Sequence, residues 1–222
     1  SVDRLDVTGG AGLLFGRSVG PAALVVAGCN AFASYGLFAA GVQPFGVFSH
    51  FYLETKTNLA SGFVEWQNPT ARNLKDSNSD IAAPRITQAV IDKLKRLAQA
   101  QKSAVGPARF ALWTHLFDPH STYMEHAEYP VPKGWKFLEA RYDAEVKFTD
   151  KHVGLILQAL RDAGLSERTA VVIFADHGEA FGEHKLGGEP LYFHGESLYN
   201  EVLRVPLSLV EAVLRGPVLL TI

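Results

Sequence analysis

Four short runs of apolar residues in this chain alternate with longer segments in which apolar residues recur every three or four positions. The runs are FGVFSHF (residues 45–51), ARFALWTHL (108–116), TAVVIFAD (169–176) and RVPLSLV (204–210). They are rich in Val, Ile and Phe and nearly continuous, a pattern typical of parallel strands buried on both faces. We therefore predict four strands of a mostly parallel sheet.

Two segments between these runs have the apolar period of amphipathic helices. Residues 84–102 begin with a proline near the first turn and carry one apolar stripe, formed by Ile86, Val90, Leu94 and Leu97. Residues 142–164 end at a glycine, a natural helix stop, and carry a second stripe, formed by Tyr142, Val146, Thr149, Val153, Ile156, Leu157 and Leu160. Strands that alternate with helices indicate an α/β fold, in which ligands gather at the carboxyl ends of the strands.

The composition is that of an ordinary globular protein. The 222 residues are 47% hydrophobic and 20% charged, with a formal net charge of −2. This length allows a sizeable core. The balanced charge and the absence of Lys/Arg-rich stretches argue against a nucleic-acid partner. The single cysteine, Cys29, excludes an intrachain disulfide.

One long segment lacks charged side chains. No Asp, Glu, Lys or Arg occurs from Ser18 to Leu53, a length that would permit a membrane span. Two prolines and several polar residues interrupt it, and it lacks the continuous Leu/Ile/Val character of a spanning helix. We predict buried strands, turns and a short helix there, and a membrane segment within residues 18–53 is the alternative. The first residues do not carry the pattern of a signal peptide.

The third predicted strand stops at a carboxylate beside an imidazole. Asp176 and His177 follow its apolar run, so they are expected at the rim of the sheet, and Gly178 would let the backbone turn sharply. A carboxylate oxygen beside an imidazole nitrogen suits a divalent cation such as Mn²⁺, Zn²⁺ or Mg²⁺. Two ligands do not complete a coordination shell, so other segments must contribute. The alternative is that Asp176 caps the next turn and His177 is a surface residue.

The residues around this pair resemble a known family. Asp176-His177-Gly178-Glu179 is followed by Gly182-Glu183-His184, then by His194-Gly195 and SLYNEVLRVPL. The order and the spacing are similar to those of the sulfatase family of the alkaline phosphatase superfamily. The resemblance implies an α/β core with a mostly parallel sheet sandwiched between helices. It also implies a divalent cation (Ca, Mg, Mn or Zn) with Asp176 and His177 among its ligands.

A second motif carries the same resemblance. The segment ALWTHLFDPHSTY looks like the family's strand followed by Asp-Pro-His and an aromatic residue. The resemblance implies that His120 contacts the sulfate or phosphate group and that His194 contacts the oxyanion and the leaving group. The alternatives are a histidine that only closes a turn and a loop histidine in solvent. His115 lies within the predicted strand, and we interpret it as a packed core residue.

The chain departs from the family pattern in three ways. The Asp pair that ends the family's first strand is not found, and we expect that strand to precede residue 1. The nucleophile should fall between Ala22 and Tyr35, where Cys29 is followed by Ala33 in place of the expected arginine. Cys29 is thus either a formylglycine precursor or a small buried residue. The chain also ends before the family's C-terminal subdomain, so residues 1–222 are expected to form one partial sulfatase-like α/β domain.

The resemblance implies a sulfuric ester hydrolase that acts on a small-molecule or saccharide ester. One alternative is a phosphodiesterase, phosphonate hydrolase or phosphoglycerol-transferase-like enzyme, which would take a phosphate ester. Another is an inactive fragment or pseudoenzyme that binds an anion or a partner, since the nucleophile motif and the first Asp pair are not found. Whether the chain is an enzyme therefore stays open at this point. The family suggests an extracytoplasmic or periplasmic location.

Overall fold

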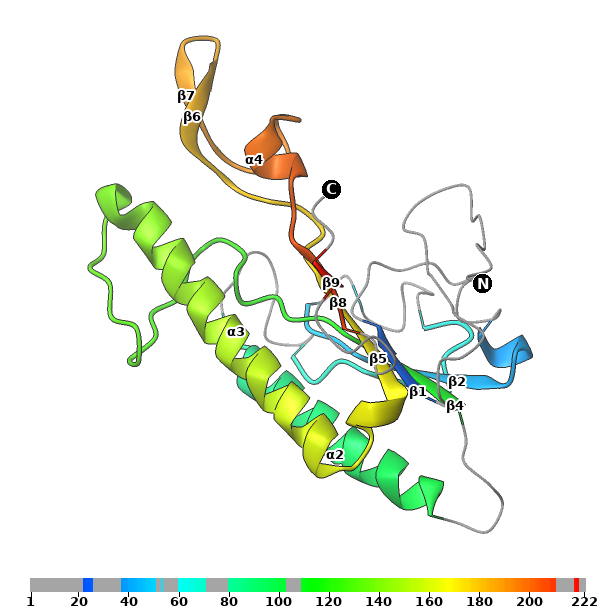
Figure 1. The fold of residues 1–222 in the computed structure, drawn as a ribbon. Helices are drawn as coiled ribbons and strands as arrows, with labels where there is room; N and C mark the ends of the chain where they lie inside the picture. The colour runs from blue at the N-terminus through cyan, green and yellow to red at the C-terminus, as the bar shows by residue number, and fades with distance from the viewer. Residues whose placement is uncertain are drawn as a thin grey trace.

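The fold is built around a mixed β-sheet. The computed structural model describes residues 22–25, 37–50, 53, 60–70, 80–102, 109–210 and 218–219. Within them, seven strands form one sheet in the order β3-β2-β4-β1-β5-β8-β9 (Figure 1). In chain order they are β1 (Ala22–Val25), β2 (Val42–Val47), β3 (Glu65–Gln67), β4 (Arg109–Thr114), β5 (Thr169–Phe174), β8 (Leu207–Val210) and β9 (Val218–Leu219).

The prediction of a mostly parallel sheet is confirmed. Strands β3, β2, β4, β1 and β5 run parallel to one another. Strand β8 pairs antiparallel with β5, and β9 pairs antiparallel with β8. The last four residues of the run RVPLSLV therefore form an antiparallel strand. It begins at Leu207, and residues 204–206 are outside the strand.

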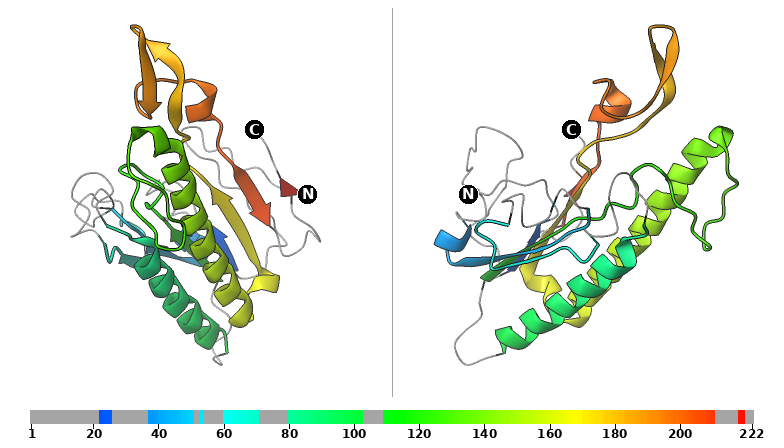
Figure 2. Two further views of the ribbon diagram at one scale, coloured as in Figure 1. Left: turned by 90° about the vertical axis from the view of Figure 1, so that its left-hand side faces the viewer. Right: turned by 180° about the vertical axis from the view of Figure 1, so that it is seen from behind.

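Two long helices lie side by side on one face of the sheet (Figures 1 and 2). They are α2 (Ala83–Gln101) and α3 (Leu138–Asp162), and they pack against each other. A hairpin of β6 (Ala180–Leu186) and β7 (Glu189–Phe193) projects away from the sheet (Figure 2). The described residues also include the short helical turns η3 (Trp135–Phe137), η4 (Ser166–Arg168) and α4 (Asn200–Leu203).

The core lies between this pair of helices and the sheet. The predicted stripe of α2 is buried in full, from Ile86 to Leu97. It packs in one apolar cluster with Phe45 and Val47 of β2 and with Phe110 and Leu112 of β4. Alternate residues of these two strands supply the cluster, because successive side chains of a strand point to opposite faces.

The predicted stripe of α3 is correct only in its second half. The helix begins at Leu138 rather than at 142, and Ile156 and Leu160 are buried as expected. In the first half, however, Val146 is 40% exposed and Glu145 is fully buried. This half of the helix packs against a polar loop that contributes His126, so apolar periodicity gave the wrong face.

The start of α2 is tied to the loop that follows β4. The helix begins after Ala82, whose side chain cannot cap it. Instead, Oδ1 of Asp118 accepts hydrogen bonds from the backbone N–H groups of Ala82 and Ala83, each at 3.0 Å. This contact satisfies two of the N–H groups that a helix start leaves without partners. Burial raises the pKa of Asp118 to about 6. The contact also fixes the chain two residues before His120.

The uncharged segment contains strands of the sheet. Residues 22–25 and 42–47 form β1 and β2, as the prediction of strands in this segment requires, and β2 is mostly buried. None of the helices within the described residues combines the length and apolar character that a membrane-spanning segment requires. Residues 26–36 of this segment lie outside the described residues. Cys29 lies outside the described residues.

Candidate active site

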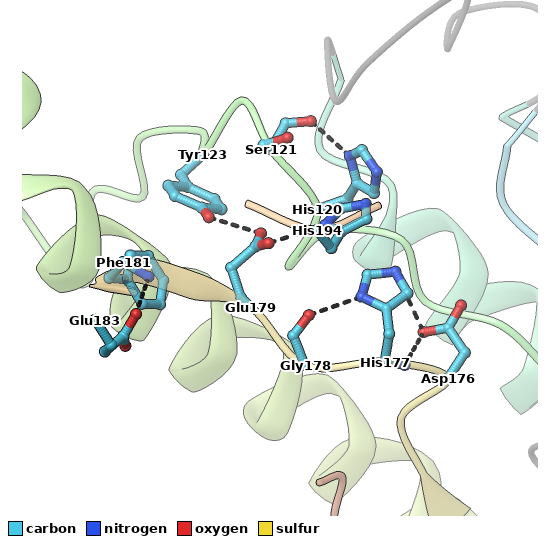
Figure 3. Close-up of polar contacts among 10 residues, drawn as sticks. All are labelled: His120, Ser121, Tyr123, Asp176, His177, Gly178, Glu179, Phe181, Glu183 and His194. Atoms are coloured by element: carbon cyan, nitrogen blue, oxygen red, sulfur yellow. Dashed lines mark hydrogen bonds and ion pairs between the residues drawn. The ribbon is translucent and has the colours of Figure 1, made fainter. Parts of the chain in front are cut away.

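Histidines and acidic side chains gather where the parallel strands end. Asp176 and His177 follow the end of β5, with one residue between, and His120 lies on the loop that follows β4. Because β4 and β5 run parallel to the same central strand, both segments emerge at the same edge of the sheet. His194 reaches this edge from the end of β7 (Figure 3).

The Asp176–His177 pair places a carboxylate oxygen close to an imidazole nitrogen. Oδ1 of Asp176 lies 3.8 Å from Nε2 of His177. Nδ1 of the same imidazole is 2.8 Å from the carbonyl oxygen of Gly178, and because a carbonyl oxygen only accepts, Nδ1 carries the proton. Nε2 of the neutral ring is therefore the unprotonated nitrogen, which is the form that binds a metal. This donor set fits a divalent cation.

The pair supplies two ligands. Among the described residues, no group of three or more His, Cys, Asp or Glu side chains is arranged to hold a metal ion. The carboxylate of Asp176 is 73% exposed, so it faces solvent at the rim. Its Oδ1 also accepts the backbone N–H of His177 at 3.1 Å, which fixes the carboxylate next to the ring. Further ligands would have to come from water, substrate or other segments.

Gly178 is needed for a close approach and not for a left-handed turn. Its φ does not lie among the positive values found at eight other glycines. A Cβ at this position would lie 2.0 Å from the carbonyl oxygen of Glu201. The backbone N–H of Gly178 donates to the carbonyl of Val202 at 2.7 Å, and that of Glu179 donates to the carbonyl of Glu201 at 3.0 Å. The segment around α4 therefore holds the Asp176–His177 turn in place.

The structure brings the four predicted site residues together. The ring of His194 lies 3.9 Å from that of His177 and 4.9 Å from that of His120, measured between centroids (Figure 3). Nδ1 of His120 donates to the carbonyl oxygen of Ser121 at 2.6 Å. Burial lowers the pKa of His120, and the neighbouring His194 lowers it further. His120 in its neutral form thus presents an unprotonated Nε2, so it donates to an anion only when both ring nitrogens carry protons.

Sequence reasoning missed two residues that shape this site. Oε1 of Glu179 is 2.9 Å from Nδ1 of His194, and its Oε2 accepts the hydroxyl of Tyr123 at 2.8 Å. Burial raises the pKa of Tyr123, and the hydrogen bond to Glu179 adds to this effect. Glu179 follows directly after the Asp-His-Gly motif, and this adjacency was the available signal. Tyr123 is 56 residues away from Glu179 in the chain, and no local pattern connects them.

Two more histidines lie behind the cluster. His115 is half-buried, with Nδ1 3.2 Å from Oγ of Ser49. Burial lowers the pKa of His115, and the charge of Asp176 opposes this shift. His115 follows the last residue of β4, and its interpretation as a packed core residue stays a prediction. His50 is buried at the end of the β2 segment, with a φ of 91°. Its ring lies 4.1 Å from that of Phe117, which stacks on His120 at 4.4 Å.

His184 of the Gly-Glu-His motif has a different position. It lies on β6, where its ring stacks on Tyr199 at 3.8 Å. Its Nε2 is 3.4 Å from Oε1 of Glu201. These contacts connect the hairpin to α4, which in turn holds Gly178. The motif therefore supports the site indirectly.

Comparison with known proteins gives a consistent family. The family model described as Sulfatase matches residues 38–209. The low-salt glycan biosynthesis sulfotransferase Agl7 of Haloferax volcanii is 32% identical over 126 residues, which are 53% of this chain and 31% of that protein. Arylsulfatase K of Bos taurus is 33% identical over 97 residues, 43% of this chain and 17% of the relative. Iduronate 2-sulfatase of Mus musculus is 36% identical over 81 residues, 36% of this chain and 14% of the relative.

Solved structures share the fold. The lipoteichoic acid synthase LtaP of Listeria monocytogenes superposes with a TM-score of 0.60 at 16% identity, over 83% of this chain and 47% of that one. The C-terminal periplasmic domain of EcEptC from Escherichia coli, in a complex with Zn, gives 0.55 at 14% identity, over 80% and 51%. The chain thus spans less than a third of these curated relatives and about half of these solved chains.

Proposed function

The chain belongs to the sulfatase family, and from that premise we propose that it carries out metal-dependent hydrolysis of a sulfate ester. At the coarser level it is a hydrolase-like protein of the alkaline phosphatase superfamily. The observation that carries the proposal is the Asp176–His177 pair, whose Oδ1 and Nε2 atoms lie 3.8 Å apart beside His194. A carboxylate, a metal-competent imidazole and two further imidazoles at one sheet edge suit the chemistry of an ester of an oxyanion.

Asp176 and His177 would hold the cation. A bound Ca²⁺, Mg²⁺, Mn²⁺ or Zn²⁺ would supply Lewis-acid polarisation of the ester oxygens. The oxygen of Asp176 suits all four ions, whereas the nitrogen of His177 favours Zn²⁺ and Mn²⁺ over Ca²⁺. The hydrogen bond from His177 to Gly178 keeps the ligating nitrogen free of a proton.

His194 and His120 would contact the substrate. Of the three imidazoles, His194 is the one whose Nδ1 faces a carboxylate, which leaves Nε2 for the substrate; Nε2 would donate to the departing alkoxide when both ring nitrogens carry protons. His120 approaches from the other strand end, stacked on Phe117 and hydrogen-bonded to Ser121. It would contact the equatorial oxygens of the ester when its Nε2 carries a proton.

We propose a substrate class from what is bound to a solved relative. A solved relative, Ps i-CgsB, was crystallised in complex with k-i-k-neocarrahexaose, an oligosaccharide, and this chain covers 49% of it with a TM-score of 0.52. We infer a sulfated saccharide or a small sulfate ester as substrate. The solved EcEptC domain is described as periplasmic, and we propose an extracytoplasmic location for this protein as well.

The test is turnover of aryl sulfate and aryl phosphate esters with each of the four cations added. The proposal predicts sulfate ester hydrolysis that needs a cation and is lost in Asp176→Ala. Hydrolysis of the phosphate ester alone would support the phosphodiesterase alternative. Absence of turnover with any cation, together with measurable cation binding, would support the inactive anion- or partner-binding alternative.

A further inference from the structure

The three imidazoles of the site are held in different ways. His120 and His177 each donate Nδ1–H to a backbone carbonyl, of Ser121 and Gly178. His194 instead faces the carboxylate of Glu179, with 2.9 Å between Nδ1 and Oε1. A backbone carbonyl is fixed by the fold, whereas a carboxylate orients a ring only if it is itself fixed. The contacts of Glu179 therefore decide how firmly His194 is oriented.

Both the backbone and the side chain of Glu179 are held by hydrogen bonds. Its backbone N–H donates to the carbonyl of Glu201 at 3.0 Å. Its side chain is only 4% exposed, and its second oxygen accepts the hydroxyl of Tyr123 at 2.8 Å. A buried carboxylate is costly unless both oxygens have donors, and here the donors are Tyr123 and His194. Rotation of the carboxylate would break one contact or the other.

Tyr123 is anchored in turn to helix α3. Its backbone carbonyl accepts a hydrogen bond from Arg141. The next backbone N–H, that of Met124, donates to Glu145, which is fully buried. Oε2 of Glu145 lies 2.7 Å from Nε2 of His126, two residues further along the same loop. A chain of direct contacts thus runs from α3 through this loop and Glu179 to His194.

The backbone next to His194 also departs from ordinary conformations. Phe193 has a φ of 67°, in a region that bulky residues adopt rarely. Such a conformation persists where surrounding contacts determine it. The ring of Phe193 packs with that of Tyr123, at 6.4 Å between centroids. Tyr123 therefore contacts both Phe193, the residue before His194, and Glu179, whose carboxylate faces the ring of His194.

We propose that Glu179 is the positioning residue for His194, and that the Tyr123 hydroxyl holds Glu179 in the required rotamer. The pair fixes the Nδ1–H tautomer of His194, so Nε2 is the nitrogen turned to the substrate. In the other tautomer the lone pair of Nδ1 would face the lone pairs of the Glu179 carboxylate, so the contact with Glu179 disfavours it. The catalytic use of this arrangement rests on the proposed function. The tautomer of His194, however, is a property of the protein without metal or substrate.

The direct test is ¹⁵N NMR of the histidine side chains, with a chelator present and above the ordinary imidazole pKa of about 6.5. His194→Gln assigns the signals. The expected result is the Nδ1–H tautomer for His194 in the wild type and a mixture of tautomers in Glu179→Gln, whose amide can donate to Nδ1. Tyr123→Phe should shift the population in the same direction but less.

The matched control is Tyr142→Phe. Tyr142 packs edge-on against Tyr123, at 5.5 Å, but its hydroxyl makes no hydrogen bond within the described part of the chain. Its removal should leave the tautomer unchanged. Because Glu179→Gln can reduce folding, Tyr123→Phe provides the independent variant, and circular dichroism checks both. An Nε2–H tautomer in the wild type, or an unchanged tautomer in both variants, would overturn the proposal.

An activity measurement separates this proposal from the proposed function. If the wild type turns over an aryl ester, Glu179→Gln should lower kcat about 10–100-fold with little change in KM. Tyr123→Phe should lower kcat roughly fivefold. Absence of wild-type turnover counts against the proposed function alone, because the tautomer measurement decides the positioning role without it.

Discussion

Oδ1 of Asp176 and Nε2 of His177 lie 3.8 Å apart, on adjacent residues just beyond the end of a central parallel strand. Both atoms are held by hydrogen bonds within the same turn. The carboxylate accepts the backbone N–H of His177, and the ring donates Nδ1–H to Gly178. The backbone after them is hydrogen-bonded to the α4 segment. The arrangement leaves one oxygen and one ring nitrogen together at the rim, where a cation would meet both.

Gly178→Ala should distort this turn. The added Cβ would lie 2.0 Å from the carbonyl oxygen of Glu201, and this is backbone that cannot move without breaking the hydrogen bonds to α4. We expect a loss of about 2–4 kcal/mol in the free energy of unfolding, measured with denaturant, and weaker cation binding.

The matched control for this change is Gly154→Ala. Gly154 is exposed within α3, and a Cβ there meets nothing within 4 Å. Alanine should stabilise the helix by up to about 1 kcal/mol. If both substitutions changed the free energy of unfolding by the same amount, the close contact at Gly178 would not exclude a side chain at that position.

Asp118 should make stability depend on pH in the acidic range. Burial raises its pKa to about 6 in the folded state, against an unfolded value of 3.8. Between these values the folded state binds more protons, so its stabilising contribution is largest near pH 4 and falls as pH rises to 6. Relative to Asp118→Asn, the wild type should lose on the order of 3 kcal/mol over this range.

The measurement is the free energy of unfolding of both proteins as a function of pH. Asp150→Asn, at an exposed position on α3, serves as the control and should follow the wild type. A wild type that keeps or gains stability relative to Asp118→Asn as pH rises from 4 to 6 would contradict the buried, protonated form of Asp118.

The His126–Glu145 pair should respond very differently to two substitutions. Both side chains are buried, at 2% and 0% exposure, and burial raises the pKa of Glu145 to about 8. His126→Ala removes the partner of a buried acid and a ring that stacks on Phe148, so it should cost about 3–5 kcal/mol.

Glu145→Gln is the matched substitution for this pair. Its amide oxygen can accept the N–H of Met124, and its NH₂ can donate to Nε2 of His126, so both contacts survive. We expect a cost below about 1 kcal/mol in thermal or denaturant unfolding. A large loss in Glu145→Gln would mean that the negative charge itself, and not the hydrogen bonding, stabilises the loop.

The sequence was sufficient for four strands of the sheet and for one of the helices. The strands β2, β4, β5 and β8 overlap the four apolar runs, and the buried stripe of α2 is the predicted one. Asp176 and His177 are neighbours in the chain, and a strand before them places them at the rim. In the first half of α3 the buried residues are Ala144, Glu145 and Phe148, and the predicted stripe missed this face because Glu145 is polar and its partner, His126, comes from another segment. Further along the helix the buried His152 likewise contacts Thr87 of α2.

The support of His194 could not be predicted from local patterns. Tyr123 and Glu179 are 56 residues apart, and Glu179 and His194 are 15 residues apart on either side of a hairpin. Nothing in their spacing distinguishes these residues from other loop residues. Their roles depend on tertiary contacts, as does the need for glycine at position 178.

Titration calorimetry with Mn²⁺ or Zn²⁺ tests the cation site most directly. The wild type should bind one cation per chain, with modest affinity because the pair offers two ligands, and Asp176→Ala should abolish the heat of binding. Asp150→Ala, which removes an exposed carboxylate from α3, should bind like the wild type. Unchanged cation binding in Asp176→Ala would contradict the assignment of Asp176 and His177 as the metal-binding pair.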